Sequence, residues 1–305
     1  MQSAPRTIVV LGTGGTIAGR AGSPDQHLAY SSAVLPVEQL LAALPAGGGE
    51  LVSASEQVAQ VDSKDMDFAI WRRLAEAVER HLARPEVRGV VITHGTDTLE
   101  ETAYFLARVV DASKPVVLTA AMRPASSSEA DGPANLASAI VVAAHADPGV
   151  VVVLASQVHS ARAVRKVHPS RLDAFSSGEQ GPLAQIVAGT VRPLHAWPTE
   201  APSIGLANLP EDPAAWPWVE IVTAVPAPTA GPSTCSFRAA LPESSSPRPA
   251  MERSTVASST RCSKRARAAS RCCAARAASM GRSPRAKGTR SPRPAISRRS
   301  RRGSS

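Results

Sequence analysis

The sequence predicts an α/β fold in which an open, mostly parallel sheet carries helices on both faces. Short valine-rich runs lack the polar alternation of a half-exposed strand, as is typical of strands covered on both faces. Longer segments between these runs place apolar residues at helical spacing. The two kinds of segment alternate along residues 1–200. This order is the one expected of an open α/β sheet.

The strands are predicted first, because their composition is the clearest signal. Each of the predicted strands is rich in valine, contains no charged residue and is followed by a helical or a polar segment. The predicted ranges are Thr7–Leu11, Gly89–Thr93, Pro115–Thr119 and Gly149–Ala155.

Helices are predicted between these strands. Asp67–Ala83 and Thr98–Val110 each repeat apolar residues near the i, i+4, i+7 spacing of a single helix face. A further helix is expected to begin at Asp131, where Pro133 takes a first-turn position that proline tolerates.

Charge is divided unevenly along the 305 residues. Residues 231–305 carry 18 Lys and Arg but 2 Asp and Glu, whereas residues 1–230 carry 16 basic and 23 acidic residues. After Thr223 no apolar period continues, and Arg, Ser, Ala and Pro dominate. A segment of this composition cannot bury enough apolar surface to offset its chain entropy. We therefore expect it to be disordered.

The apolar runs also bear on localisation. The first run, Ile8–Leu11, is too short for the core of a signal peptide. The strongest run, Val150–Ala155, is far below the roughly 20 residues of a membrane span. The cysteines all lie at or beyond Cys235, so no disulfide framework supports the α/β part. We expect a soluble, cytoplasmic protein without a membrane partner.

Glycine and hydroxyl residues follow the first strand in "TGGTIAG", residues 13–19. A dinucleotide fingerprint needs a third glycine where Ile17 stands, and a phosphate loop needs Lys where Arg20 stands. A plain tight turn is an alternative. The glycines also let backbone and substrate approach closely, so Thr16 is a candidate nucleophile.

A similar loop, His94–Asp97, follows the second predicted strand. One interpretation is a helix cap, with Asp97 or Thr98 at the start and acidic residues in the first turn. That interpretation leaves a second hydroxyl loop at a neighbouring strand end unexplained. Ligands of open α/β sheets bind beyond the carboxyl ends of the strands, where both loops lie. We assign His94 a structural role.

These loops resemble the bacterial-type L-asparaginase family. "TGGTIAG" and "HGTDTLEETAYFL" carry the resemblance, and it continues through "DSKDM", "AMRP…ADGPANL" and "GPLAQI" in the family's order. The resemblance implies an amidohydrolase that converts L-asparagine to aspartate and ammonia, without a cofactor or a metal. It also implies a homo-oligomer, a tetramer in the family.

The resemblance also implies a role for each site residue. Thr16 is the nucleophile, Tyr30 assists it from the loop that follows, and Thr96 is the second threonine, backed by Asp97 and a lysine. Ser63 holds the α-carboxylate of the substrate, Thr96 and Asp97 bind substrate with Asp97 on its ammonium, and the backbone at Ala121 contacts the amide. The lysine falls on Lys166.

Elementary chemistry supports these roles. A threonine hydroxyl is a poor nucleophile at neutral pH and needs a base or a polarising environment. An uncharged lysine can accept a proton while a carboxylate orients it, and such help is worth about 10²–10⁴ in rate. Without the resemblance, Lys166 reads as a solvated charge in a basic run with Arg162 and Arg165.

The chain departs from the family pattern in two places. Lys64 stands where many members have glutamine, and a lysine there repels the substrate ammonium unless it turns away. The smaller second α/β domain of the family has no counterpart past about residue 224. We therefore expect a catalytic domain over 1–200, a linker with the start of a second domain over 201–224, and a basic tail over 225–305.

Two explanations of the tail stay open. Its basic residues could bind nucleic acid in a salt-dependent way, although Phe237 is its single aromatic residue for stacking. Arg, Ala, Ser and Pro are also what a GC-rich gene encodes in the wrong frame. We favour a frameshift, expect no nucleic-acid partner, and expect weak activity from the chain as written.

Alternative functions also stay open. The chain could prefer glutamine, or resemble the amidotransferase subunit that acts on tRNA-linked glutamate. It could instead be a non-catalytic protein that binds an amino acid or a nucleic acid.

Overall fold

The computed structural model describes residues 7–25, 29–45, 47–197, 203–217 and 219. The chain divides into two compact units, Met1–Ile221 and Val222–Ser305, and all described residues belong to the first. The predicted basic tail, residues 225–305, lies outside the described residues.

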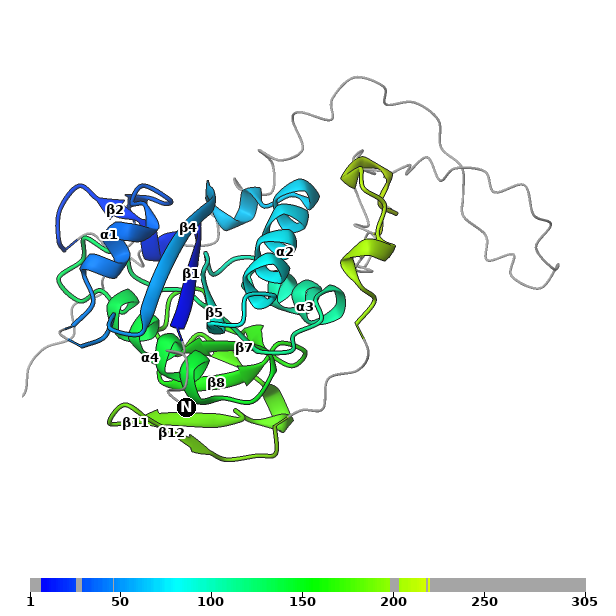
Figure 1. The fold of residues 1–305 in the computed structure, drawn as a ribbon. Helices are drawn as coiled ribbons and strands as arrows, with labels where there is room; N and C mark the ends of the chain where they lie inside the picture. Colours follow the sequence, from blue (N-terminus) through cyan, green and yellow to red (C-terminus); the bar gives the residue numbers. More distant parts are fainter. Residues whose placement is uncertain (1–6, 26–28, 46, 198–202, 218, 220–305) are drawn as a thin grey trace, which may run out of the picture. The chain divides into compact units, whose positions relative to one another are not determined.

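An eight-stranded sheet forms the centre of this unit (Figure 1). Its strand order is β12-β11-β8-β7-β6-β5-β1-β4. The strands from β4 to β7 pair in parallel, whereas β8, β11 and β12 extend the sheet by antiparallel pairing. In chain order the strands are β1 (Thr7–Gly14), β4 (Val52–Val61), β5 (Val87–Thr93), β6 (Pro115–Thr119), β7 (Gly149–Leu154), β8 (Gln157–Ser160), β11 (Ala184–Val187) and β12 (Thr190–Pro193).

Two short strand pairs lie outside the central sheet. The strand β2 (Arg20–Ala21) pairs with β3 (Tyr30–Ser31), and β9 (Arg165–Lys166) pairs with β10 (Phe175–Ser176), both antiparallel. Each pair carries one residue of the predicted site.

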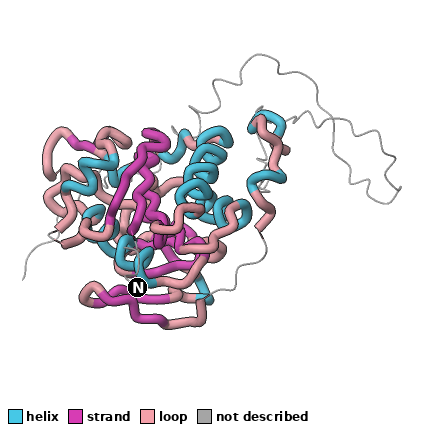
Figure 2. Tube along the Cα trace, viewed as in Figure 1, coloured by secondary structure: helices cyan, strands magenta, loops and turns pink. Residues whose placement is uncertain are grey.

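Helices cover both faces of the sheet, as the tube in Figure 2 shows. Along β1, Val9 and Leu11 pack into one apolar core with α2 and α3, while Ile8 and Val10 pack into the other core with α1 and α4. This division follows from the alternation of side chains along a strand. The helices are α1 (Val37–Ala42), α2 (Phe68–Leu82), α3 (Leu99–Val109) and α4 (Gly132–His145).

The predicted fold class is confirmed, and the predicted elements agree closely with the structure. The strand β1 runs further than expected, to Gly14, because its glycines continue to pair with β4. The strand β7 ends one residue early, at Leu154, because Ala155 and Ser156 take φ values of 47° and 60° and turn the chain into β8.

Local sequence explains where the helices begin. The carboxylate of Asp67 accepts a hydrogen bond from the backbone N–H of Ile70, which caps α2. In α4, Pro133 lies in the first turn, as predicted. Among the described residues, no helix combines the length and the apolar character needed to cross a membrane.

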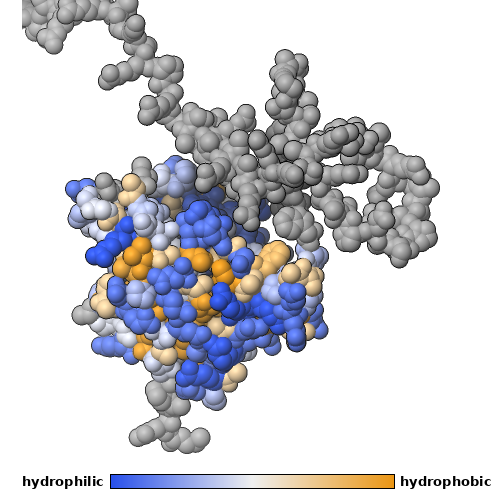
Figure 3. Space-filling model, turned by 90° about the horizontal axis from the view of Figure 1, so that it is seen from above, coloured by the Kyte–Doolittle hydropathy of each residue, from blue (hydrophilic) through white to orange (hydrophobic). Residues whose placement is uncertain are grey.

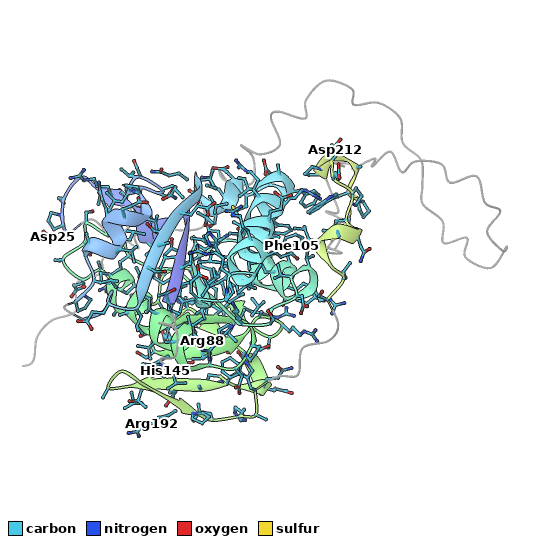
Figure 4. All side chains as sticks on the ribbon, viewed as in Figure 1. Asp25, Arg88, Phe105, His145, Arg192 and Asp212 are labelled. Atoms are coloured by element: carbon cyan, nitrogen blue, oxygen red, sulfur yellow. The ribbon has the colours of Figure 1, made fainter. Side chains whose placement is uncertain are left out.

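The two ends of the parallel strands differ in chemistry. At their amino ends, Arg88 donates a hydrogen bond to the carbonyl of Ala146 and lies near His145 (Figure 4). At their carboxyl ends lie the loops predicted to form the site. Figure 3 views the molecule from above and shows hydrophobic residues gathered near the middle of that face among hydrophilic ones.

Candidate active site

The two predicted loops touch through their glycines. Because β1 and β5 are neighbours in parallel register, with Gly12 opposite Thr93, both loops leave the sheet at the same edge. A Cβ on Gly15 would lie 2.2 Å from the Cα of Gly95, so only hydrogen fits between the two backbones. The loops are therefore in direct contact, which brings Thr16 and Thr96 to neighbouring positions.

Thr16 begins the short 3₁₀ helix η1 (Thr16–Ala18) and is largely buried. Its Oγ1 lies 2.7 Å from the phenol oxygen of Tyr30, and either oxygen can be the donor. Tyr30 comes from β3, which returns antiparallel to β2 just after the loop. Two of the predicted site residues thus form one hydrogen-bonded pair.

Thr96, Asp97 and Lys166 form a second cluster. The Nζ of Lys166 lies 2.8 Å from Oγ1 of Thr96 and 2.7 Å from Oδ1 of Asp97. Lys166 reaches the loop from β9, where its backbone pairs with Phe175 of β10. The Lys166 side chain is 20% exposed and that of Asp97 54%, so the ion pair faces solvent on the carboxylate side.

Glu100 fixes the position of the lysine backbone. Its carboxylate accepts a hydrogen bond from the backbone N–H of Lys166, which joins the first turn of α3 to β9. From the sequence, Glu100 is simply an acidic residue in a helix first turn. No local signal predicts this long-range bond.

Ser63 lies beneath the second loop. It begins the 3₁₀ helix η2 (Ser63–Asp65) and is 3% exposed. Its Oγ accepts a hydrogen bond from the backbone N–H of Asp97 at 3.1 Å, and its carbonyl accepts one from Thr98 Oγ1 at 2.7 Å. A Cβ on Gly95 would lie 2.5 Å from Ser63 Oγ, so glycine is required for this close approach.

Ala121 lies two residues beyond the end of β6 and is fully buried. A Cβ on Gly132 would lie within contact distance of both Ala121 and Ile17, which places the Ala121 segment beside the Thr16 loop. Asp131 shapes this segment, because its carboxylate accepts hydrogen bonds from the backbone N–H groups of Met122 and Arg123 at 3.0 and 2.9 Å. The sequence shows Asp131 only as a helix start.

His94 is completely buried behind the second loop. Its Nδ1 lies 2.7 Å from the carbonyl of Gly95, so Nδ1 carries the proton and Nε2 accepts from Thr102 at 3.1 Å. Thr102 in turn accepts from the indole of Trp71 at 2.9 Å. Burial lowers the pKa of His94 to about 4, which keeps the ring neutral. His94 therefore braces the loop against α2 and α3, in keeping with a structural role.

Thr98 occupies the N-cap position of α3, but its hydroxyl donates to Ser63 and makes no side-chain cap. The helix-cap interpretation is therefore right about the position of Thr98, which precedes the first residue of α3. It does not describe the hydrogen bond of the Thr98 hydroxyl, which goes to Ser63 and not to the helix. Asp97 lies just before the helix and pairs with Lys166.

The ammonium of Lys64 is held by carboxylates. Its Nζ lies 2.6 Å from Asp62 and 3.1 Å from Asp65. The hydrogen bond to Asp62 raises the pKa of Lys64. Burial acts to raise the pKa of Asp62, but hydrogen bonds from Lys64 and Ser32 hold that pKa below its usual value. The positive charge that departs from the family pattern is thus paired with neighbouring carboxylates.

The described residues contain no group of three or more His, Cys, Asp or Glu side chains arranged to hold a metal ion. His159 is buried and its Nδ1 lies 2.8 Å from Ser177, while His168 accepts backbone hydrogen bonds from Ser170 and Arg171. The site chemistry rests on hydroxyls, a lysine and carboxylates.

Comparisons with known proteins agree on one family. The model of the family described as "Asparaginase, N-terminal" matches residues 7–198. The chain is 42% identical over 177 residues to "L-asparaginase 2" of Bacillus subtilis, covering 57% of this chain and 47% of the relative. It is 39% identical over 189 residues to "Glutaminase-asparaginase" of Pseudomonas fluorescens biotype A, covering 60% and 51%.

A solved structure shows the same likeness. The crystal structure of a probable cytoplasmic L-asparaginase from Campylobacter jejuni matches with a TM-score of 0.60 and 42% identity, covering 62% of this chain and 59% of that one. The chain spans about half the length of the curated relatives it matches.

Proposed function

Because this chain belongs to the asparaginase family, we propose that it is an amidohydrolase that converts L-asparagine to L-aspartate and ammonia. One observation carries the proposal. Two threonine hydroxyls stand on touching loops, and each has its own partner, Tyr30 for Thr16 and Lys166 with Asp97 for Thr96. A pair of activated hydroxyls at one sheet edge suits attack on an amide.

In the first half of the reaction, Oγ1 of Thr16 forms a bond to the side-chain amide carbon of the substrate. Its proton passes to the oxygen of Tyr30 as the Tyr30 proton passes to the leaving nitrogen. The carbon–nitrogen bond breaks and ammonia leaves, so Thr16 becomes an ester of aspartate. The 2.7 Å contact between the two hydroxyls makes this relay short.

In the second half, water attacks the ester. Lys166 becomes a base once its ammonium, which is paired with Asp97, has given a proton to solvent. Thr96 then takes a proton from the water, and Lys166 takes one from Thr96 over the 2.8 Å contact between them. Asp97 accepts a hydrogen bond from the same Nζ and fixes its direction. The ester bond breaks, the leaving Thr16 oxygen takes the Tyr30 proton across their 2.7 Å contact, and aspartate is released. Solvent returns a proton to Tyr30, and Lys166 is again the ammonium partner of Asp97.

The remaining predicted residues hold the substrate. Ser63 lies under the second loop and would bind the α-carboxylate, and Asp97 would bind the α-ammonium through its exposed carboxylate edge. The backbone at Ala121 would accept from the amide nitrogen. Lys64 is paired with Asp62 and Asp65, so its charge is balanced near the substrate ammonium.

The organisation of the whole protein is part of the proposal. Residues 1–200 form the catalytic domain and 201–224 the linker with the start of a second domain. The protein is cytoplasmic and associates as a homo-oligomer, a tetramer as in the family. The basic residues 225–305 arise from a shifted reading frame, which an intact mass and the gene sequence would test.

Ammonia release from L-asparagine by the purified full chain tests the activity, with Thr96→Val as the blank. Release that disappears in Thr96→Val and in Thr16→Ala supports the threonine mechanism. Release that persists in both variants contradicts it. If the wild-type chain releases none, the frame-corrected protein is assayed in the same way, and its inactivity sinks the proposal.

Glutamine is a second candidate substrate, because several relatives at 39–40% identity are named glutaminase-asparaginase. Parallel assays with L-asparagine and L-glutamine give the ratio of kcat/KM. A higher value for asparagine supports the first candidate, and a higher value for glutamine the second.

A further inference from the structure

The segment that carries Tyr30 is held by residues at and just after the carboxyl end of β4. Ser32 Oγ donates a hydrogen bond to Oδ2 of Asp62 at 2.9 Å. The amide of Gln60 donates to the carbonyls of Ala33 and Val34 at 2.9 and 3.0 Å. These contacts join residues near position 32 to residues near position 61, which are far apart in the sequence.

Asp62 also organises the segment that carries Ser63. It occupies the N-cap position of η2, and its side chain accepts from the backbone N–H of Lys64. Its Oδ2 accepts from the Lys64 ammonium at 2.6 Å as well as from Ser32. One carboxylate therefore connects the Tyr30 segment with Lys64 in η2, the short helix that Ser63 begins.

We infer that Ser32 and Asp62 are positioning residues that set the separation between Tyr30 and Ser63. The inference rests on the proposed function, in which Tyr30 works on the nucleophile and Ser63 holds the α-carboxylate. Neither Ser32 nor Asp62 contacts Thr16. They act by fixing the loop from which Tyr30 reaches it.

Other hydrogen bonds also fix this loop, mainly through its backbone: the N–H groups of Val34 and Leu35 donate to the carbonyl of Ala18 at 2.7 and 2.9 Å. The β2–β3 pair contributes two residues from each strand, Arg20–Ala21 and Tyr30–Ser31. The backbone of Ala33 donates to the carbonyl of Gly15 at 3.0 Å, after Tyr30 and Ser32 in the chain. The Ser32–Asp62 bond holds the Tyr30 segment through a side chain two residues after Tyr30, and a hydrogen bond to a charged carboxylate is stronger than a neutral one.

A double-mutant cycle tests the inference in the full chain. Ser32→Ala is expected to lower kcat/KM for L-asparagine about three- to tenfold, as for loss of one hydrogen bond. In the Tyr30→Phe background the same change should have no further effect, because the positioned hydroxyl is gone. Asp62→Asn keeps an oxygen acceptor for Ser32 and should restore most of the activity that Asp62→Ala loses.

Limited trypsin digestion gives a readout that needs no activity. Arg20 is exposed, and it is the single Lys or Arg between Thr7 and Ser63. Ser32→Ala and Asp62→Ala should speed cleavage after Arg20 several-fold, measured by mass spectrometry of the released peptide. Ser55→Ala is the matched control. Ser55 lies on β4, the strand that leads to Asp62, and its hydroxyl donates to the Glu38 carboxylate of α1 at 3.3 Å, away from Tyr30.

The outcomes separate the two claims. Faster cleavage after Arg20 in Ser32→Ala and Asp62→Ala, but not in Ser55→Ala, supports the tie whether or not the chain is active. Unchanged cleavage overturns it. An equal loss of kcat/KM in the wild-type and Tyr30→Phe backgrounds overturns the positioning role of Ser32. Faster cleavage in both variants, with no turnover by the wild type or by the frame-corrected protein, contradicts the proposed function and leaves the tie supported.

Discussion

The two hydroxyl clusters of the site are built differently. Thr16, from η1, and Tyr30, from the short β2–β3 strand pair outside the central sheet, form an uncharged pair. Thr96, Asp97 and Lys166 form an ionic cluster that is tied to α3 through Glu100 and braced from behind by His94. Under the proposed mechanism, the braced cluster supplies proton transfer from a fixed position. The marginal pair provides the nucleophile at a loop that can admit substrate.

The largest expected effect falls on the braced cluster. Lys166→Met removes the proposed base and should lower kcat for asparagine by about 10²–10⁴-fold, the usual contribution of a general base. Steady-state ammonia release measures it. Lys114→Met is the matched control, because the Lys114 ammonium donates to the carbonyl of Arg84 outside the site. An equal loss in both variants would show that Lys166 acts through stability.

A smaller effect is expected at the marginal pair. Tyr30→Phe removes the hydroxyl beside Thr16 and should lower kcat roughly 10–100-fold, below the full effect of a general acid–base group. The sequence contains two tyrosines, so Tyr104→Phe on the exposed side of α3 is a complete control. Full activity of Tyr30→Phe would contradict the proposed role of the Thr16–Tyr30 pair, since Thr16 would then act as the nucleophile without a hydroxyl partner.

Stability should distinguish the clusters as well. Thr102→Val removes the hydroxyl that links His94 to Trp71, so the buried His94 ring and the partly buried Trp71 indole each lose a hydrogen-bond partner. We expect a fall of about 1–3 kcal/mol in the free energy of unfolding. Urea denaturation measures it, with exposed Thr190→Val as the control. Equal midpoints for Thr102→Val and the wild type would show that the brace contributes nothing.

The last expected effect concerns pH. Burial holds the pKa of both His94 and His159 at about 4, below the ordinary value of 6.5. The unfolded chain binds protons on these rings first, so the free energy of unfolding should fall as pH drops from 6.5 towards 4. Urea midpoints across this range measure it. His159→Asn should flatten the slope, whereas exposed His145→Asn should not.

The fold could be predicted where burial is complete. The strands β1, β5, β6 and β7 are apolar runs because helices cover the sheet on both faces, so composition alone reveals them. The strand β4 escaped prediction because it is an edge strand of mixed burial whose residues, VSASEQVAQV, alternate poorly. The antiparallel strands β8, β11 and β12 are too short for a periodic signal.

The site was predicted through motifs rather than physical patterns. Thr16 and Thr96 follow strands and stand among glycines, which is a signal in the sequence itself. Lys166, Tyr30 and Ser63 were assigned by resemblance, and their roles stay predictions, although the structure places Tyr30 beside Thr16 and Lys166 beside Thr96.

The supporting residues escaped prediction for a different reason. Glu100, Asp131 and Asp62 each look like an ordinary acidic residue near a helix start. Their partners lie far along the chain or in a turn whose shape depends on the whole sheet. One sequence alone does not show which distant residues become neighbours in the fold. The reacting side chains, which stand in short motifs, are therefore easier to predict than the side chains that hold them in place.

The contact between Gly15 and Gly95 limits how this protein can be altered in the laboratory. Since the two backbones meet without a side chain between them, a change at either position cannot be compensated by trimming the other. A randomised library of the two loops should therefore return functional clones that vary at the surrounding positions and keep both glycines. Attempts to widen substrate range by loop remodelling are best directed at Lys64 and residues 20–25, which are exposed or partly exposed.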